Sequence, residues 1–197
     1  MTNDRRFAEL VSVACHDILT PLATVYGFAR TLEQLPLEPP APRYLEMIGA
    51  ASAQIDDLVD QLRLVARIEA GKYDPTLVER DSLELARAAA ERLEEGRLNV
   101  AGRGKPVLVD PEPAARALSQ LARAAARFGG HESVSLDVDG PELVLSPLSR
   151  SARPVVLGED ARELAGPAAA LLIEALGGSL DAREDELVIR LASGSSS

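Results

Sequence analysis

A long repeat of apolar residues at alternating spacings of four and three constrains this chain more than any other feature. The repeat places one stripe of side chains along an α-helix and is typical of coiled coils and helical bundles. The sequence therefore predicts one long helix from about residue 7 to residue 32. Its apolar positions are Phe7, Val11, Ala14, Ile18, Pro21, Val25, Phe28 and Leu32.

A second helix is predicted after a proline-rich turn. Residues 35–42 carry four prolines, which remove backbone donors and fix φ, so the first helix cannot continue through them. From about Arg43 the same spacing resumes, and Gly71 is a stop signal for the helix. The apolar positions of this second helix are Tyr44, Ile48, Ala51, Ile55, Leu58, Leu62 and Val65.

Residues 1–73 are thus expected to form an antiparallel helical hairpin. Two helices with two apolar stripes do not enclose a core by themselves. The simplest completion is the same hairpin from a second copy of the chain, and we expect a homodimeric four-helix bundle.

The pattern changes after Pro75 to short strands and helices, which is typical of a separate α/β or α+β domain. Strands are expected at 76–80, 107–109, 134–138, 143–145, 179–182 and 186–191, and helices at 82–95, 111–128 and 159–176. Ser82 and Asp110 are expected to cap the first two of these helices. We place this second domain at residues 74–192, followed by a disordered, serine-rich tail at 193–197, so that the fold class is α+β overall.

Composition excludes several functions. With 31 acidic and 21 basic residues the net charge is −10, which disfavours nucleic acid and anionic membranes as partners and favours a protein with a basic patch. No apolar run is long enough to cross a bilayer, so a cytoplasmic protein is expected. A single cysteine excludes an intramolecular disulfide and a multi-thiolate metal site.

The residues best suited to chemistry lie in the segment 15–22, inside the first predicted helix. Counted from the apolar stripe, His16 falls on the outward face, with Asp17 beside it and Thr20 one turn further along. An exposed histidine beside an aspartate is usually a solvated surface residue. A neutral imidazole is also a competent nucleophile when a carboxylate selects its tautomer.

The pattern His-Asp-x-x-Thr-Pro-Leu on the first of two long helices resembles the H-box of the dimerisation and phosphoacceptor domain of two-component sensor histidine kinases. The resemblance covers residues 7–70. It implies that His16 is the phosphorylated residue, that Asp17 orients or deprotonates the imidazole, and that Thr20 helps to dephosphorylate the partner. It also implies two kinds of partner, a response-regulator receiver domain and an upstream histidine kinase.

Residues 75–192 resemble the ATP-binding α/β sandwich of these kinases in the order of their elements, but depart from it where chemistry is needed. Ala124 stands where the family has a magnesium-binding asparagine. Residues 149–153, Ser-Arg-Ser-Ala-Arg, replace the family's Asp-x-Gly-x-Gly motif, and the second glycine motif, near 163–166, keeps one glycine. The resemblance therefore implies a degenerate domain that binds no ATP and no cofactor of its own, with Mg²⁺ supplied by the receiver domain.

The favoured function is a histidine phosphotransferase that exchanges a phosphoryl group between His16 and a receiver aspartate, without ATP-dependent autokinase activity. Two alternatives stay open. One is a non-catalytic pseudokinase that serves as an interaction module, and the other is an active histidine kinase whose nucleotide site has diverged.

Other polar or reactive residues receive structural interpretations. Residues 102–105 are expected to be a plain turn, since they lack the glycine spacing and the Ser or Thr of a phosphate loop. Cys15 is expected to pack beside the apolar stripe, and His131 to lie in a loop. The acidic set Asp56, Asp57 and Asp60 is either a docking surface or, as favoured, a solvated helix face.

Overall fold

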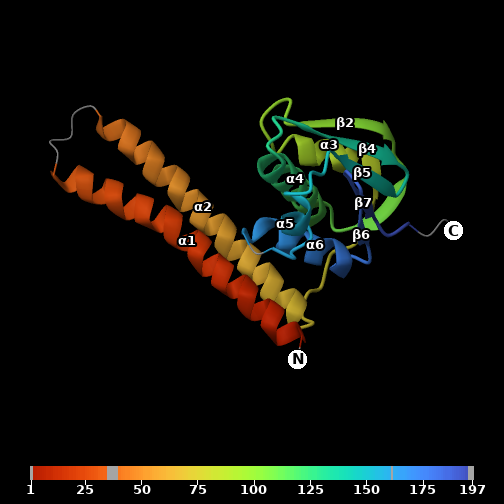
Figure 1. Ribbon diagram of the computed structural model, residues 1–197, viewed down its shortest axis with the longest axis horizontal. Coiled ribbons are helices and arrows are strands. Elements are labelled where there is room, and N and C mark those ends of the chain that lie inside the picture. The colour runs from red at the N-terminus through yellow and green to blue at the C-terminus, as the bar shows by residue number, and fades with distance from the viewer. Residues whose placement is uncertain (1, 35–39, 161, 195–197) are drawn as a thin grey trace. The chain divides into compact units, whose positions relative to one another are not determined.

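The computed structural model describes residues 2–34, 40–160 and 162–194, with side chains from Asp17 onward except that of Glu33 (Figure 1). The chain divides into two compact units, Met1–Arg63 and Leu64–Ser197. The division falls inside the second long helix.

The first unit is the predicted helical hairpin. Helix α1 spans Thr2–Gln34 and helix α2 spans Ala41–Glu69, so α2 begins two residues earlier than the sequence predicts. Pro42 does not prevent this, because the first turn of a helix needs no backbone donor at that position. Of the predicted proline-rich turn, residues 35–39 lie outside the described part of the chain.

The apolar stripes of the prediction form the inner side of the hairpin. Pro21 and Ala51 are buried, and the other described positions of the stripes are buried or half-buried. The rings of Phe28 on α1 and Tyr44 on α2 stack with their centroids 5.2 Å apart. This contact joins the end of α1 to the start of α2, as the antiparallel order requires.

Helix α2 ends at the predicted stop. Gly71 has a φ of +63°, its N–H donates to the carbonyl of Ile68, and the Lys72 N–H donates to the carbonyl of Arg67 at 2.8 Å. This pair of bonds is a Schellman motif, in which a glycine takes the left-handed conformation at low cost.

The second unit is an α/β sandwich. A five-stranded mixed sheet has the order β2-β4-β5-β7-β6, in which β2 and β4 are parallel and the other pairs antiparallel, and a two-stranded sheet pairs β1 with β3. The strands are β1 Val78–Asp81, β2 Leu98–Arg103, β3 Pro106–Val109, β4 Val134–Asp139, β5 Glu142–Ser146, β6 Ser179–Arg183 and β7 Glu186–Arg190. The helices are α3 Ser82–Ala90, α4 Pro111–Gly129, α5 Arg153–Val156 and α6 Ala165–Ala175.

One apolar core joins this sheet to its helices. Leu121 of α4, Ile173 of α6, Leu136 of β4 and Leu143 of β5 are each at most 1% exposed and belong to the same cluster. The central strands β4 and β5 alternate buried and more exposed positions, so one face of the sheet and one side of each helix supply the core. The sequence prediction of an α+β chain, with a helical hairpin before an α/β sandwich, is confirmed.

Proline and glycine bound α4 and the β4–β5 hairpin as predicted. Pro111 opens α4, and Gly130 closes it in a left-handed conformation with φ +70°. Gly140, with φ +62°, turns the chain between β4 and β5. Asp110 caps α4 only through its backbone, because its carboxylate accepts the N–H of Thr76 at 3.1 Å.

Three local predictions in this unit are wrong. Gly102 and Arg103 lie in β2, a strand that the sequence did not predict, because it is an edge strand with one fully buried side chain and no clear alternation. The helix expected at 82–95 ends at Ala90, and the helix expected at 159–176 begins at Ala165, with the separate short helix α5 before it.

Ser82 is also not the cap of α3. That role belongs to Asp81, whose carboxylate accepts the N–H groups of Leu83 and Glu84. The hydroxyl of Ser82 is buried, donates to the carbonyl of Gly140 and accepts from the Lys105 N–H at 3.1 Å. Ser82 is therefore the first residue of α3, and its hydroxyl bonds to two other segments instead of capping the helix.

Of the expected tail, Ser193 forms a bridge with Val107, and residues 195–197 lie outside the described part. None of the helices that the structure describes is long and apolar enough to cross a membrane.

Candidate functional site

The predicted site residues lie in the interior of α1. His16, Asp17 and Thr20 all belong to its continuous helical backbone, which places His16 and Thr20 one turn apart. The side chain of His16 is outside the described part of the chain. The candidate site therefore consists of His16, placed by its helical backbone, with Asp17 beside it and Thr20 one turn along.

The neighbours differ in their exposure. Asp17 is half-buried, and Thr20 is exposed to solvent. Pro21, which follows, is buried and has no N–H to give to the preceding turn, yet α1 continues through it. One turn later, the Thr24 hydroxyl donates to the carbonyl of Thr20 at 3.2 Å. The side chain of Thr20 is thus open to water, and its backbone carbonyl is held by the next turn.

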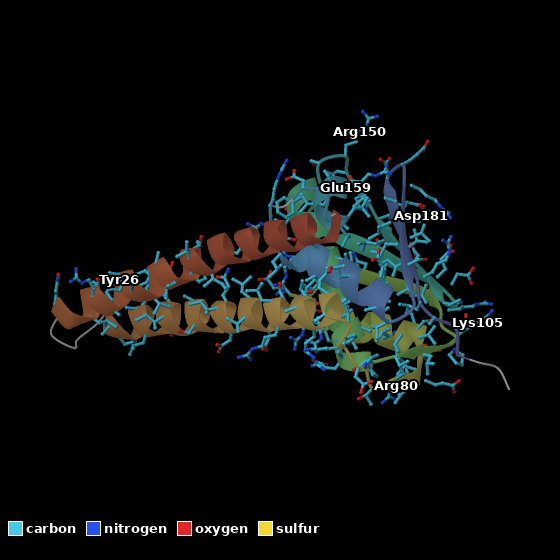
Figure 2. All side chains as sticks on the ribbon, turned by 90° about the horizontal axis from the view of Figure 1, so that it is seen from below. Tyr26, Arg80, Lys105, Arg150, Glu159 and Asp181 are labelled. Carbon is cyan, nitrogen blue, oxygen red and sulfur yellow. The ribbon has the colours of Figure 1, made fainter. Side chains whose placement is uncertain are left out.

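Large apolar side chains are exposed on the same helix. Leu19 is 61% exposed and Tyr26, which Figure 2 labels on α1, is also 61% exposed, while Leu22 between them is 47% exposed. The spacing of these three residues puts them on one face of α1. On α2, Leu45 is 59% exposed.

The residues at the positions where the family binds nucleotide have structural roles in this chain. Ala124 is 1% exposed in the interior of α4 and offers only a methyl group. Ser149 and Ser151 bond to each other through their hydroxyls at 2.9 Å. Ser151 also donates to the carbonyl of Phe128, and the Ser149 hydroxyl accepts the N–H of Ala152. Both serines therefore fix the turn that precedes α5.

The one glycine kept in the second glycine motif also has a packing role. Gly166 is buried, and a Cβ there would lie 3.1 Å from the carbonyl oxygen of Val155. A side chain at this position would require the Val155 backbone to shift by a few tenths of an ångström. Close helix approach is sufficient to explain this glycine.

Metal ligands are not gathered anywhere in the described residues. Among the side chains that the structure describes, which begin at Asp17, there is no group of three or more His, Cys, Asp or Glu residues placed to hold a metal ion.

Comparison with known families decides what kind of domain carries these residues. Residues 8–71 match the His Kinase A (phospho-acceptor) domain. This range contains His16, Asp17 and Thr20, and it coincides with most of α1 and α2. The hairpin is therefore a histidine-kinase-like phosphoacceptor domain.

Solved structures share the whole fold. The histidine kinase AdeS of Acinetobacter baumannii is 16% identical, with a TM-score of 0.64 over 91% of this chain and 98% of that chain. A bacterial phosphotransferase is 18% identical, with a TM-score of 0.50 over 94% of each chain. Full-length ShkA, in a complex with AMPPNP, is 23% identical with a TM-score of 0.51, and the match covers 96% of this chain and 47% of ShkA.

No curated protein matches the sequence. The family match and the shared fold together give a chain organised like a two-component sensor histidine kinase, with a phosphoacceptor hairpin before an α/β sandwich. The resemblance found in the sequence is thus confirmed for the hairpin by the family match and for the whole chain by the fold.

Proposed function

We propose that this chain is a cytoplasmic histidine phosphotransferase, in which His16 exchanges a phosphoryl group with an aspartate of a response-regulator receiver domain. The observation that carries the proposal is the match of residues 8–71 to a phospho-acceptor domain, with His16 inside it. The fold shared with a bacterial phosphotransferase is in keeping with it.

The transfer needs a nucleophile that is not already charged. A neutral imidazole nitrogen of His16 attacks the phosphorus of the receiver's aspartyl phosphate, an N–P bond forms, and the bond to the carboxylate oxygen breaks. The aspartate leaves as a free carboxylate, and the reverse step returns the phosphoryl group. Mg²⁺ would be held by the receiver domain, so this chain would need no metal or cofactor of its own.

The neighbours of His16 suit two supporting roles. Asp17 is adjacent on α1 and half-buried, where a carboxylate can hold the proton on the second imidazole nitrogen and so fix the tautomer. Thr20 is exposed one turn along, where its hydroxyl can position a water that hydrolyses the receiver's aspartyl phosphate.

Loss of the ATP site is part of the proposal. An ATP site of the histidine-kinase type needs an oxygen ligand for Mg²⁺, a carboxylate for adenine and glycines that let the backbone approach the phosphates. Ala124 offers a buried methyl group, Ser149 and Ser151 bond to each other, and Ser151 donates to the carbonyl of Phe128 on α4. These observations support a phosphotransferase that receives its phosphoryl group from another protein.

A homodimer completes the proposed protein. Ile18, Val25, Ile48 and Ile55 on the apolar stripes are only half-buried within one chain. A second hairpin packed in a four-helix bundle would bury what remains of these side chains. The proposed partners are thus a second copy, a receiver domain and an upstream histidine kinase that supplies the phosphoryl group, with no nucleic acid and no membrane.

The test is transfer from phosphorylated receivers. Each receiver domain of the source organism is phosphorylated on its aspartate and mixed with the full chain, and acid-labile, base-stable phosphate is measured on the chain. The expected result is rapid label on His16 from at least one receiver. Binding to a receiver without transfer in either direction would overturn the proposal and leave the interaction module as the function.

A further inference from the structure

A basic pocket opens on the α/β unit beside α4. It has a volume of about 530 Å³, within the usual range of small-molecule sites. One wall is α4, which contributes Ala122 and Ala126, and the other is the segment between α3 and β2, which contributes Leu93. These three side chains give the pocket an apolar floor.

The charge of the lining contrasts with that of the chain. Arg97, Arg123 and Arg127 contribute three positive charges and Glu94 one negative charge, a balance of +2 in a chain whose net charge is −10. Arg123 and Arg127 are one turn apart on α4 and therefore present their guanidinium groups on the same side. A pocket of this sign attracts an anion.

The three guanidinium groups are not equally engaged. Arg97 lies 3.2 Å from the Glu94 carboxylate, and Arg127 lies 3.6 Å from that of Glu163. For Arg123, the part of the chain that the structure describes supplies no acidic partner and no hydrogen-bond acceptor for the side chain. Arg123 therefore has donors available for a ligand.

A second unpaired group lies in the wall. His131 lines the pocket, and its Nε2 atom is buried with no hydrogen-bond partner among the described residues. A buried polar atom without a partner costs free energy, so this wall of the pocket is not fully satisfied. The pocket thus combines the free donors of Arg123 with an apolar floor.

We propose that this pocket binds a phosphate monoester that carries an apolar or aromatic group. A phosphate monoester has a charge near −2 at neutral pH, and the guanidinium groups of the lining attract it more strongly than a single carboxylate. Its pairs of oxygens suit the guanidinium fork of Arg123, and its organic part fits against Leu93, Ala122 and Ala126.

This pocket is separate from the expected nucleotide position at Ala124. Ala124, which stands at the place of the family's metal-binding asparagine, does not line the pocket. The proposal therefore does not depend on whether ATP binds, nor on phosphoryl transfer at His16.

The experiment titrates the full chain with phenyl phosphate, inorganic phosphate and benzoate, followed by calorimetry and by amide chemical shifts. Phenyl phosphate is expected to bind with the highest affinity, to shift the amides of Leu93, Arg97, Arg123 and His131, and to bind more weakly as salt is raised. Arg123→Gln is expected to weaken this binding about tenfold. The matched control is Arg103→Gln, which removes the same charge from an exposed position on β2 and should leave affinity unchanged.

Each other outcome would overturn the proposal. Equal affinity for benzoate would remove the preference for phosphate, and equal affinity for inorganic phosphate would remove the role of the apolar floor. Absence of saturable binding at millimolar phenyl phosphate, an equal effect of the two arginine variants, or shifts confined to residues outside the pocket would remove the site. Assays of transfer at His16 on the same samples keep this result distinct from the test of the proposed function.

Discussion

Gly102 of β2 and Val138 of β4 are paired across two parallel strands at a separation that only glycine permits. A Cβ on Gly102 would lie 2.0 Å from the carbonyl oxygen of Val138, and the φ of Gly102 is +108°. Both the space and the backbone conformation therefore exclude a side chain at this point of the edge strand.

Gly102→Ala should destabilise the α/β unit by about 3 kcal/mol or more, because the strained backbone and the clash with Val138 add together. Gly130→Ala is the matched control, since Gly130 also has a positive φ but has open space where a Cβ would be placed, and it should cost about 1–2 kcal/mol. Urea unfolding of both variants measures the difference. Equal losses would mean that the edge strand moves to accept the methyl group.

His16→Gln should abolish phosphoryl uptake from a phosphorylated receiver, because the amide has no nucleophilic nitrogen to form the N–P bond. The dimer and the melting temperature should stay close to those of the wild type. His131→Gln is the control, since it changes the other histidine of the chain and should leave transfer intact. Acid-labile phosphate on the His16 variant would contradict the assignment.

Thr20→Ala should leave transfer to and from His16 unchanged and should slow dephosphorylation of the partner. The hydroxyl is on an exposed side chain and can position water, but it is not the acceptor of the phosphoryl group. Rates of transfer and of receiver dephosphorylation, measured separately on the same protein, test whether Thr20 acts only in dephosphorylation. A loss of transfer as large as that of His16→Gln would assign Thr20 a different role.

Ile18→Asp or Ile55→Asp should split the dimer or unfold the hairpin, because either change puts an unpaired charge where a second hairpin is expected to pack. Light scattering gives the mass, and circular dichroism separates dissociation from unfolding. Asp57→Asn, on an exposed position of α2, should keep the mass of the dimer. A wild-type chain that is monomeric at micromolar concentration would refute the four-helix bundle.

ATP with Mg²⁺ should not raise the melting temperature of the chain. Ligand at about one hundred times its dissociation constant would contribute roughly 2.7 kcal/mol of stability, which a thermal melt detects easily. The motivation is the buried methyl group of Ala124 and the bonded serines at 149 and 151. A saturable stabilisation, joined by label on His16 from ATP, would favour the divergent kinase instead.

The hairpin was predictable from sequence because its signal is long and regular. Seven or eight apolar positions per helix agree on one period, and Gly71 marks the end of α2, so the predicted start of that helix is wrong by only two residues. The order of most strands and helices in the second unit was also predictable, since turns at Gly130 and Gly140 separate short apolar segments.

The parts that the sequence did not predict depend on contacts far along the chain. Strand β2 is an edge strand that is defined by pairing with β4, more than thirty residues later, and its own residues carry a weak pattern. Ser82 is a residue type that often caps helices, but its hydroxyl is committed to Gly140 and Lys105. The pocket beside α4 likewise needs α4 and the segment before β2 to meet, which the spacing of Arg123 and Arg127 alone does not show.

Helix α2 limits where this protein can be truncated or joined to a related protein. It runs without a break from Ala41 to Glu69, yet Leu64 and Ile68 in its last turns pack on the core of the α/β unit. A fragment that begins after Tyr73 would leave that part of the core open to water. A fragment that begins at Leu64 would keep it covered, but by a helical stub too short to hold its shape without that core. Chimeras with related proteins should therefore be joined upstream of Leu64, within the hairpin.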